Sequence, residues 1–106
     1  MSEYCVVYTT FEKKDDALRI IHTLIFEKLI ACGNIIDGVT SVYPWKGKIE
    51  QVSEVIVLIK TKSQHYNAVE KRIKELHSYE IPFISQLNLE SVFAPYANWI
   101  NEETKQ

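Results

Sequence analysis

The feature that most restricts the fold of this chain is an unbroken run of five aliphatic residues, Val55 to Ile59, between a glutamate and a lysine. A short run rich in β-branched residues is typical of a strand, and the absence of polar alternation predicts that both faces of this strand are covered. With 106 residues, the chain has the length of one domain, 1–106. The run therefore predicts a sheet whose strand at 55–59 is buried on both sides.

The residues around this run predict a long β-hairpin from Asn34 to Lys62. Its turn is expected at Lys46-Gly47-Lys48, where the glycine allows the chain to reverse direction. Pro44 cannot donate a backbone hydrogen bond, so we expect an edge strand or a bulge near Tyr43 and Trp45. Residues 4–9 and 84–90 carry the pattern of two further strands.

Helical periodicity appears in two longer segments and in one short terminal one. The first runs from Lys13 to Ala31, with Gly33 expected to end it in the left-handed conformation. The second runs from Gln64 to His77 with Ser63 as N-cap, and residues 96–103 predict a terminal helix anchored by Trp99 and Ile100. The expected apolar stripes are Ala17, Leu18, Ile21, Leu24, Ile25 and Leu29 in the first helix, and Tyr66, Val69, Ile73 and Leu76 in the second.

Two residues of the first segment fall outside its stripe. On a helical wheel, Phe26 and Ile30 lie nearly opposite it, beside Arg19. They form either a small contact site or merely exposed apolar surface, and single surface hydrophobes are common.

The order of elements, βαββαβ plus a C-terminal helix, predicts an α+β fold of the ferredoxin-like sandwich type with one antiparallel sheet. Both helices then pack on one face of the sheet, and the other face keeps its aliphatic side chains exposed to water. We expect sister copies of the chain to cover it, with the hairpin 39–60 reaching the neighbour. The alternative is that the C-terminal helix folds back over this face.

Composition excludes several classes of function. Twelve basic against fourteen acidic residues give a net charge of −2 and a pI near 5.9, unlike a nucleic-acid-binding protein. No apolar run is long enough to span a bilayer, so we expect a soluble, cytoplasmic protein that does not bind membranes. Cys5 and Cys32 are too few for a disulfide framework and are expected to be buried.

Enzymatic motifs are absent. The chain lacks the nucleophile-elbow, phosphate-loop, dinucleotide-binding and zinc-protease patterns, and both arginines, Arg19 and Arg72, lie within helices rather than in a phosphate-binding loop. The strand at 55–59 also lacks the aromatic side chains on which RNA-binding domains stack bases. We therefore expect a protein that is not an enzyme.

The remaining chemistry gathers at the end of the second helix. His77, Tyr79 and Glu80 lie within four positions there, and imidazole with carboxylate forms a workable pair of metal ligands. Lys60 is a candidate for holding an anionic small molecule. His77 has an equally simple alternative, that of a cation favoured by the helix dipole. His22 and His65 are expected to be solvated.

Several motifs together resemble the CutA divalent-ion-tolerance family, and the likeness extends from Thr9-Thr10 to about residue 101. They are Ala31-Cys32-Gly33-Asn34-Ile35, Ser41-Val42-Tyr43-Pro44-Trp45-Lys46-Gly47-Lys48-Ile49, Glu54, Lys60-Thr61, His77-Ser78-Tyr79-Glu80-Ile81-Pro82 and Tyr96-Ala97-Asn98-Trp99-Ile100.

This resemblance implies a homotrimer similar to the PII signalling proteins, a role in tolerance of divalent cations, and no enzymatic activity. No cofactor is required, and copper is the candidate metal because some family members bind it. Tyr8 and Leu76 stand where those members have a cysteine and a histidine, so of the implied ligands only His77 is present, and copper binding stays open.

Our leading hypothesis is a homotrimer that responds to metal ions or to a small ligand. Its clefts between subunits would be lined by Trp45, Lys60, His77, Tyr79 and Glu80. The alternative is a scaffolding trimer, or a PII-like signalling module that binds a partner protein and takes up metal only adventitiously.

Overall fold

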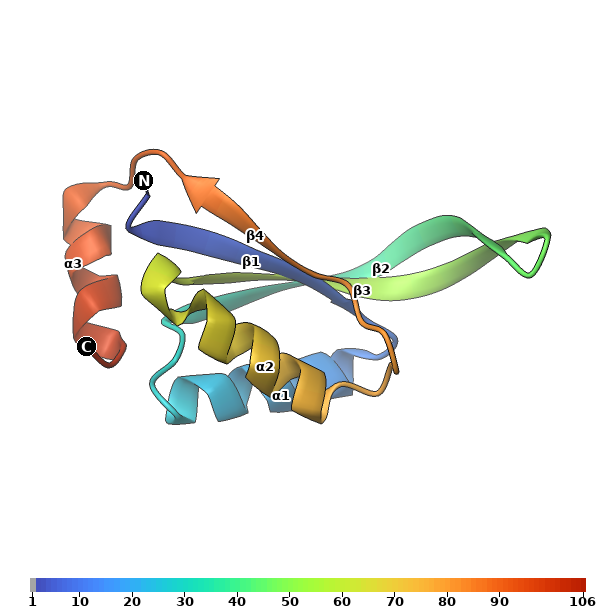
Figure 1. The fold of residues 1–106 in the computed structure, drawn as a ribbon, viewed down its shortest axis with the longest axis horizontal. Coiled ribbons are helices and arrows are strands. Elements are labelled where there is room, and N and C mark those ends of the chain that lie inside the picture. Colours follow the sequence, from blue (N-terminus) through green and yellow to red (C-terminus); the bar gives the residue numbers. More distant parts are fainter. Residues whose placement is uncertain (1) are drawn as a thin grey trace.

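One four-stranded antiparallel sheet with two helices on a single face forms the body of the protein (Figure 1). The computed structural model describes residues 2–106, and the strand order is β2-β3-β1-β4. The elements are β1 Tyr4–Phe11, α1 Lys14–Phe26, β2 Cys32–Trp45, β3 Lys48–Lys62, a 3₁₀ turn η1 Ser63–His65, α2 Tyr66–Leu76, β4 Ile84–Leu89 and α3 Ala94–Glu103. This confirms the predicted ferredoxin-like α+β architecture.

The core lies between the sheet and the helices α1 and α2. Along β1, buried and half-buried residues alternate, and Cys5, Val7 and Phe11 point into the core. In β3 the run at 55–59 alternates in the same way, because Ile56 and Leu58 point to the face without α1 and α2 and stay partly exposed. Within one chain only one face of this strand is therefore covered, and the expectation that sister copies cover the other face stays a prediction.

Helix α1 is shorter than its periodicity predicts. It ends at Phe26 and not at Ala31, because Lys28 takes the left-handed conformation with φ 63° and turns the chain toward the sheet. Ile30 lies beyond this turn and is buried, whereas Phe26 is 86% exposed. The helical wheel thus places Phe26 correctly and Ile30 wrongly.

The buried stripe of α1 also differs from the predicted one. Ala17, Ile21 and Leu24 are buried as expected. Ile20 is buried as well, while Leu18 and Ile25 are exposed. In α2 all four predicted stripe residues contact the core.

Gly33 does not end a helix. It lies in β2 without a positive φ, and its role is steric. A Cβ atom added there would lie 2.8 Å from Cδ1, 2.9 Å from Cγ1 and 3.0 Å from Cγ2 of Ile21. The missing side chain therefore makes room for a core isoleucine of α1.

The hairpin of β2 and β3 extends beyond the body of the protein as a two-stranded arm (Figure 1). The arm comprises residues 39–54, where β3 pairs with β2 but no longer with β1. Its two-residue turn is Lys46-Gly47, both with positive φ, as hairpin turns of this length prefer. β2 is an edge strand, which confirms the expectation from Pro44. The bulge lies at Asp37-Gly38 rather than near Tyr43, and Gly38 there has φ 69°.

Helix α3 stands at the end of the sheet opposite the arm and does not spread over the open face (Figure 1). Its anchor is the buried Ile100, whereas Trp99 is 40% exposed and only a partial anchor. The hydroxyl of Tyr4 donates to the side chain of Asn101 at 3.0 Å. Helix α3 therefore reaches the open face only at one end of the sheet and does not cover it as the alternative expects.

Two local expectations near α2 are also corrected. Ser63 begins the 3₁₀ turn and makes no side-chain capping bond. His65 is buried rather than solvated, and its Nε2 donates to the carbonyl of Lys105 at 2.6 Å. Of the cysteines, Cys5 is buried as predicted and Cys32 is half-buried.

Candidate functional site

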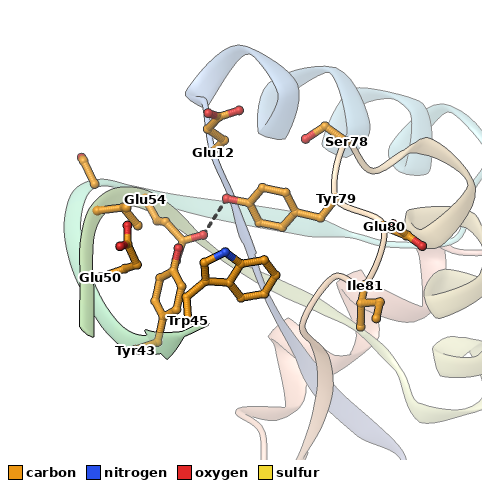
Figure 2. Close-up of a pocket in the computed structure, with 11 residues that line it drawn as sticks. Glu12, Tyr43, Trp45, Glu50, Glu54, Ser78, Tyr79, Glu80 and Ile81 are labelled. Carbon is orange, nitrogen blue, oxygen red and sulfur yellow. Dashed lines mark hydrogen bonds between the residues drawn. The ribbon is translucent and has the colours of Figure 1, made fainter. Parts of the chain in front are cut away.

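A pocket of about 730 Å³ opens between the arm and the loop that joins α2 to β4 (Figure 2). The arm contributes one wall and the loop 78–81 contributes the other. The lining residues are Glu12, Tyr43, Trp45, Glu50, Val52, Ser53, Glu54, Ser78, Tyr79, Glu80 and Ile81.

Register in the hairpin explains how the arm builds its wall. Tyr43 pairs with Glu50, and Val39 pairs with Glu54, so these side chains share one face of the two strands. Trp45 lies on the same face, paired with Lys48. Period-two alternation therefore brings aromatic and acidic side chains together on one side of the arm.

A single hydrogen bond joins the two walls. The hydroxyl of Tyr79 donates to Oε2 of Glu54 at 2.7 Å (Figure 2). Burial raises the pKa of Tyr79 well above its usual range, and the bond to Glu54 adds to this effect. The phenol stays protonated at neutral pH and fixes the loop to the arm.

His77 holds the backbone of Tyr79 in place through hydrogen bonds. Its Nε2 donates to the carbonyl of Thr10 at 2.7 Å, and its Nδ1 accepts the backbone N–H of Tyr79 at 3.0 Å. The ring stacks on Phe11 at 4.4 Å between centroids. Burial lowers the pKa of His77 below its ordinary value, so at neutral pH the ring is uncharged, which argues against a helix-dipole cation.

The charge of the pocket has one sign. Of the side chains that the structure describes, Glu12, Glu50, Glu54 and Glu80 line it, and no basic one does. Carboxylates on low-dielectric walls attract cations. Among residues 2–106, however, no three His, Cys, Asp or Glu side chains are close enough together to hold a metal ion.

The structure brings together some of the predicted site residues and separates others. Trp45, Tyr79 and Glu80 line the pocket, and His77 contacts Tyr79, with 4.8 Å between ring centroids. Lys60 lies apart, beside α3, with its Nζ 5.3 Å from the ring centroid of Tyr96. Within one chain the five predicted residues therefore do not form one cleft.

Sequence reasoning missed Glu12, Tyr43 and Glu50 as lining residues. The alternation of the hairpin strands around the turn at Lys46-Gly47 was a signal that could have found Tyr43 and Glu50. Glu12 had no such signal, because it enters the pocket from the end of β1.

Tyr8 and Leu76, which the resemblance sets at the positions of copper ligands, have other contacts here. Tyr8 packs edge-on against Phe83, with 4.9 Å between ring centroids. Leu76 packs against the hydrophobic core. Neither side chain offers a strong metal-binding atom.

Comparison with known proteins decides the family. The family described as CutA1 divalent ion tolerance protein matches residues 5–103. The chain belongs to this CutA1 family. The divalent-cation tolerance protein CutA of Pyrococcus horikoshii is 40% identical over 101 residues, which cover 95% of this chain and 98% of that protein.

Solved CutA1 structures have the same fold. CutA1 from Ehrlichia chaffeensis aligns with a TM-score of 0.95 at 31% identity, covering 100% of this chain and 99% of that one. The periplasmic divalent cation tolerance protein CutA from Archaeoglobus fulgidus aligns with a TM-score of 0.93 at 32% identity, covering 96% and 99%. These CutA proteins are named for tolerance and not for an enzymatic reaction.

Across residues 2–106, no helix is both long enough and apolar enough to cross a bilayer.

Proposed function

We propose that this CutA1-family chain acts in tolerance of divalent cations as a homotrimer that binds a metal ion, with copper among the candidates, or a small ligand in clefts between subunits. The observation that supports this best is the pocket of Figure 2, whose described lining residues include four carboxylates and no basic side chain. A cavity of this size and charge suits a cationic ligand.

Exposed apolar surface supports assembly. On the face that α1 and α2 leave uncovered, Ile36, Phe83 and Leu87 are each close to half exposed. β2 and β4 are both edge strands, so each has backbone groups free to pair with another copy. A ring of like copies covers such a face by symmetry.

Assembly also bears on metal affinity. The pocket of one chain supplies carboxylates but no compact set of three ligands. We infer that a tightly held ion takes further ligands from a second copy, or that a weakly held ion keeps most of its water. His77 would have to release one of its two hydrogen bonds to join such a site.

Calorimetric titration of the assembled protein with Cu²⁺, Zn²⁺ and Mg²⁺ tests this proposal. We expect a stoichiometric site that weakens at least about tenfold in Glu54→Gln, which removes one pocket charge and keeps the side-chain size. Glu102→Gln, on the exposed surface of α3, is the matched control and should bind like the wild type. His77→Ala tests whether the imidazole takes part directly. Equal weak binding by the wild type and by every variant would refute the proposal.

Such a result would favour the second candidate, a non-catalytic scaffold or PII-like module that binds a partner protein. The arm favours this candidate because Val42 and Ile49 are 61% and 79% exposed near its tip. We propose a non-enzymatic, cytoplasmic protein in either case. The two free cysteines, of which Cys5 is buried, fit a reducing compartment.

A further inference from the structure

The chain that follows α3 joins two parts of the fold that are far apart in the sequence. The backbone N–H of Lys105 donates to the carbonyl of Lys28, just after α1, at 2.9 Å. The carbonyl of Lys105 accepts a hydrogen bond from Nε2 of His65, just before α2, at 2.6 Å. We call residues 104–105 the strap. It lies on the side of the sheet that carries α1 and α2, and not on the open face (Figure 1).

The strap is packed within one chain. Thr104 is 3% exposed, and its Oγ1 donates to the carbonyl of Ile100 at 2.8 Å. His65 is also buried. The proposed assembly covers the opposite face of the sheet, so a sister copy there would leave these contacts as they are.

Positive charges, and no acid, act on the ring of His65. Because a carbonyl can only accept, Nε2 carries the hydrogen, and the neutral ring keeps Nδ1 unprotonated. Lys62 at the end of β3 and Lys105 in the strap are the charged groups that face it. Among residues 2–106, no Asp or Glu lies within salt-bridge distance of the ring. Burial lowers the pKa of His65, and the two lysines add to this effect against the bond to the Lys105 carbonyl.

The acids of the neighbouring elements have other contacts. On the α1 side, Arg72 donates three hydrogen bonds to the carboxylate of Glu27, at 2.8 to 3.0 Å. These bonds, and to a lesser degree the charge of Lys105, lower the pKa of Glu27, which stays ionised and paired with Arg72. On the β1 side, Glu3 meets η1 through its backbone carbonyl, which accepts the N–H of Ser63 at 2.8 Å. A proton on the buried ring therefore has no counter-ion.

We propose that the strap is a pH-sensitive device that opens when His65 takes up a proton. The imidazolium is then a buried cation beside two lysines, and exposing it to water lowers the free energy of the chain. Opening the strap achieves this at the loss of the two backbone contacts of Lys105, to His65 and to Lys28, while the sheet and the helices stay intact. The hydrated ring binds a proton near the ordinary histidine value of about 6.5 and the closed one only at lower pH, so falling pH favours the open form.

NMR of the ¹⁵N-labelled, assembled protein between pH 7.5 and pH 5 tests this proposal. The imidazole of His65 reports the proton, and the backbone amide of Lys105 reports the strap. We expect the Lys105 amide to leave its closed-state position over the same pH range in which His65 titrates. The amide of Val57, in the core of the sheet, should keep its position throughout.

Three variants separate the role of His65 from general effects of acid. His65→Gln keeps a side-chain N–H donor that cannot be charged, so its strap should stay closed at pH 5. His22→Gln, at an exposed position of α1, is the matched control and should open like the wild type. Lys105→Met keeps both backbone hydrogen bonds and removes one charge facing the ring, so the midpoint of His65 should move up toward about 6.5. This exposed substitution keeps the test valid if His65→Gln folds poorly.

Four results would overturn the proposal. The first is a wild-type Lys105 amide that keeps its closed-state position at pH 5, and the second is equal opening in His65→Gln. The third is loss of the Val57 amide together with that of Lys105, which would mean that the whole domain unfolds. The fourth is an unchanged His65 midpoint in Lys105→Met. Cation binding does not enter this test, so Glu54→Gln should open like the wild type.

Discussion

Replacement of Gly33 by alanine tests the packing of the core most directly. The added methyl group would lie 2.8 to 3.0 Å from three side-chain carbons of Ile21, although carbon atoms normally approach to about 3.5 to 4.0 Å. Ile21 is 6% exposed and belongs to the hydrophobic core. We therefore expect Gly33→Ala to destabilise the protein.

The magnitude follows from two opposing effects. Overpacking a core typically costs about 1 to 3 kcal/mol. Alanine also restricts the unfolded chain, which stabilises the protein by about 0.4 to 1 kcal/mol where the native φ suits it, as it does at Gly33. The net expectation is a loss of about 0.5 to 2 kcal/mol, and each kcal/mol lowers Tm by roughly 4 to 8 °C in a domain of this size.

Urea unfolding at one fixed protein concentration measures the effect, since the proposed assembly would make stability depend on concentration. Ile21→Val removes the carbon nearest to the new methyl group, so the double variant should lose less stability than the two single losses combined. Gly38→Ala is the matched control, because a Cβ there meets no atom within 4 Å and Ile21→Val should not relieve its backbone strain. If Gly33→Ala is as stable as the wild type, or if the two losses simply add, the steric explanation is wrong.

Two further predictions concern the walls of the pocket between the arm and the α2–β4 loop. Tyr79→Phe removes the hydrogen bond to Glu54, so it should lower the free energy of unfolding in urea by about 1 kcal/mol and increase proteolysis of the arm. Tyr43→Phe is the control and should do neither, because the hydroxyl of Tyr43 has no hydrogen-bond partner among residues 2–106. His77 has a pKa below 6.5 in the folded state, so the unfolded chain takes up its proton first, and stability should fall as the pH drops below about 6.5. His77→Gln should flatten the dependence of unfolding free energy on pH in this range, whereas His22→Gln, at an exposed position, should not. If both variants show the same slope, burial does not shift the pKa of His77 and the reasoning is wrong.

Sequence patterns predicted those elements whose signal is local. The hairpin turn at Lys46-Gly47 and the apolar stripe of α2 depend on residue type and period, and both appear in the structure. The expected end of α1 failed because a lysine, Lys28, takes a conformation that usually selects glycine. Ile30 then follows a turn and not a helix, so no helical wheel could place it.

The candidate site was predictable only in part, for a related reason. Trp45, Tyr79 and Glu80 line one pocket because the arm and the α2–β4 loop lie on either side of it, and no single segment encodes that arrangement. The hydrogen bonds of His77 to Thr10 and to the backbone of Tyr79 are tertiary contacts, invisible to spacing. Lys60 is the clearest failure of the prediction from sequence, because its position in β3 places it beside α3, at the end of the sheet opposite the pocket.

The central position of β1 has a consequence for biosynthesis. Among the four strands β1 is synthesised first, yet its two neighbours in the sheet are β3 and β4, and its Tyr4 pairs with Leu89 of β4, 85 residues later in the sequence. Pairings so distant in sequence close late and make folding slow. A nascent chain arrested before residue 84 would present β1 with one edge unpaired to chaperones, and the sheet can close only after β4 has been synthesised.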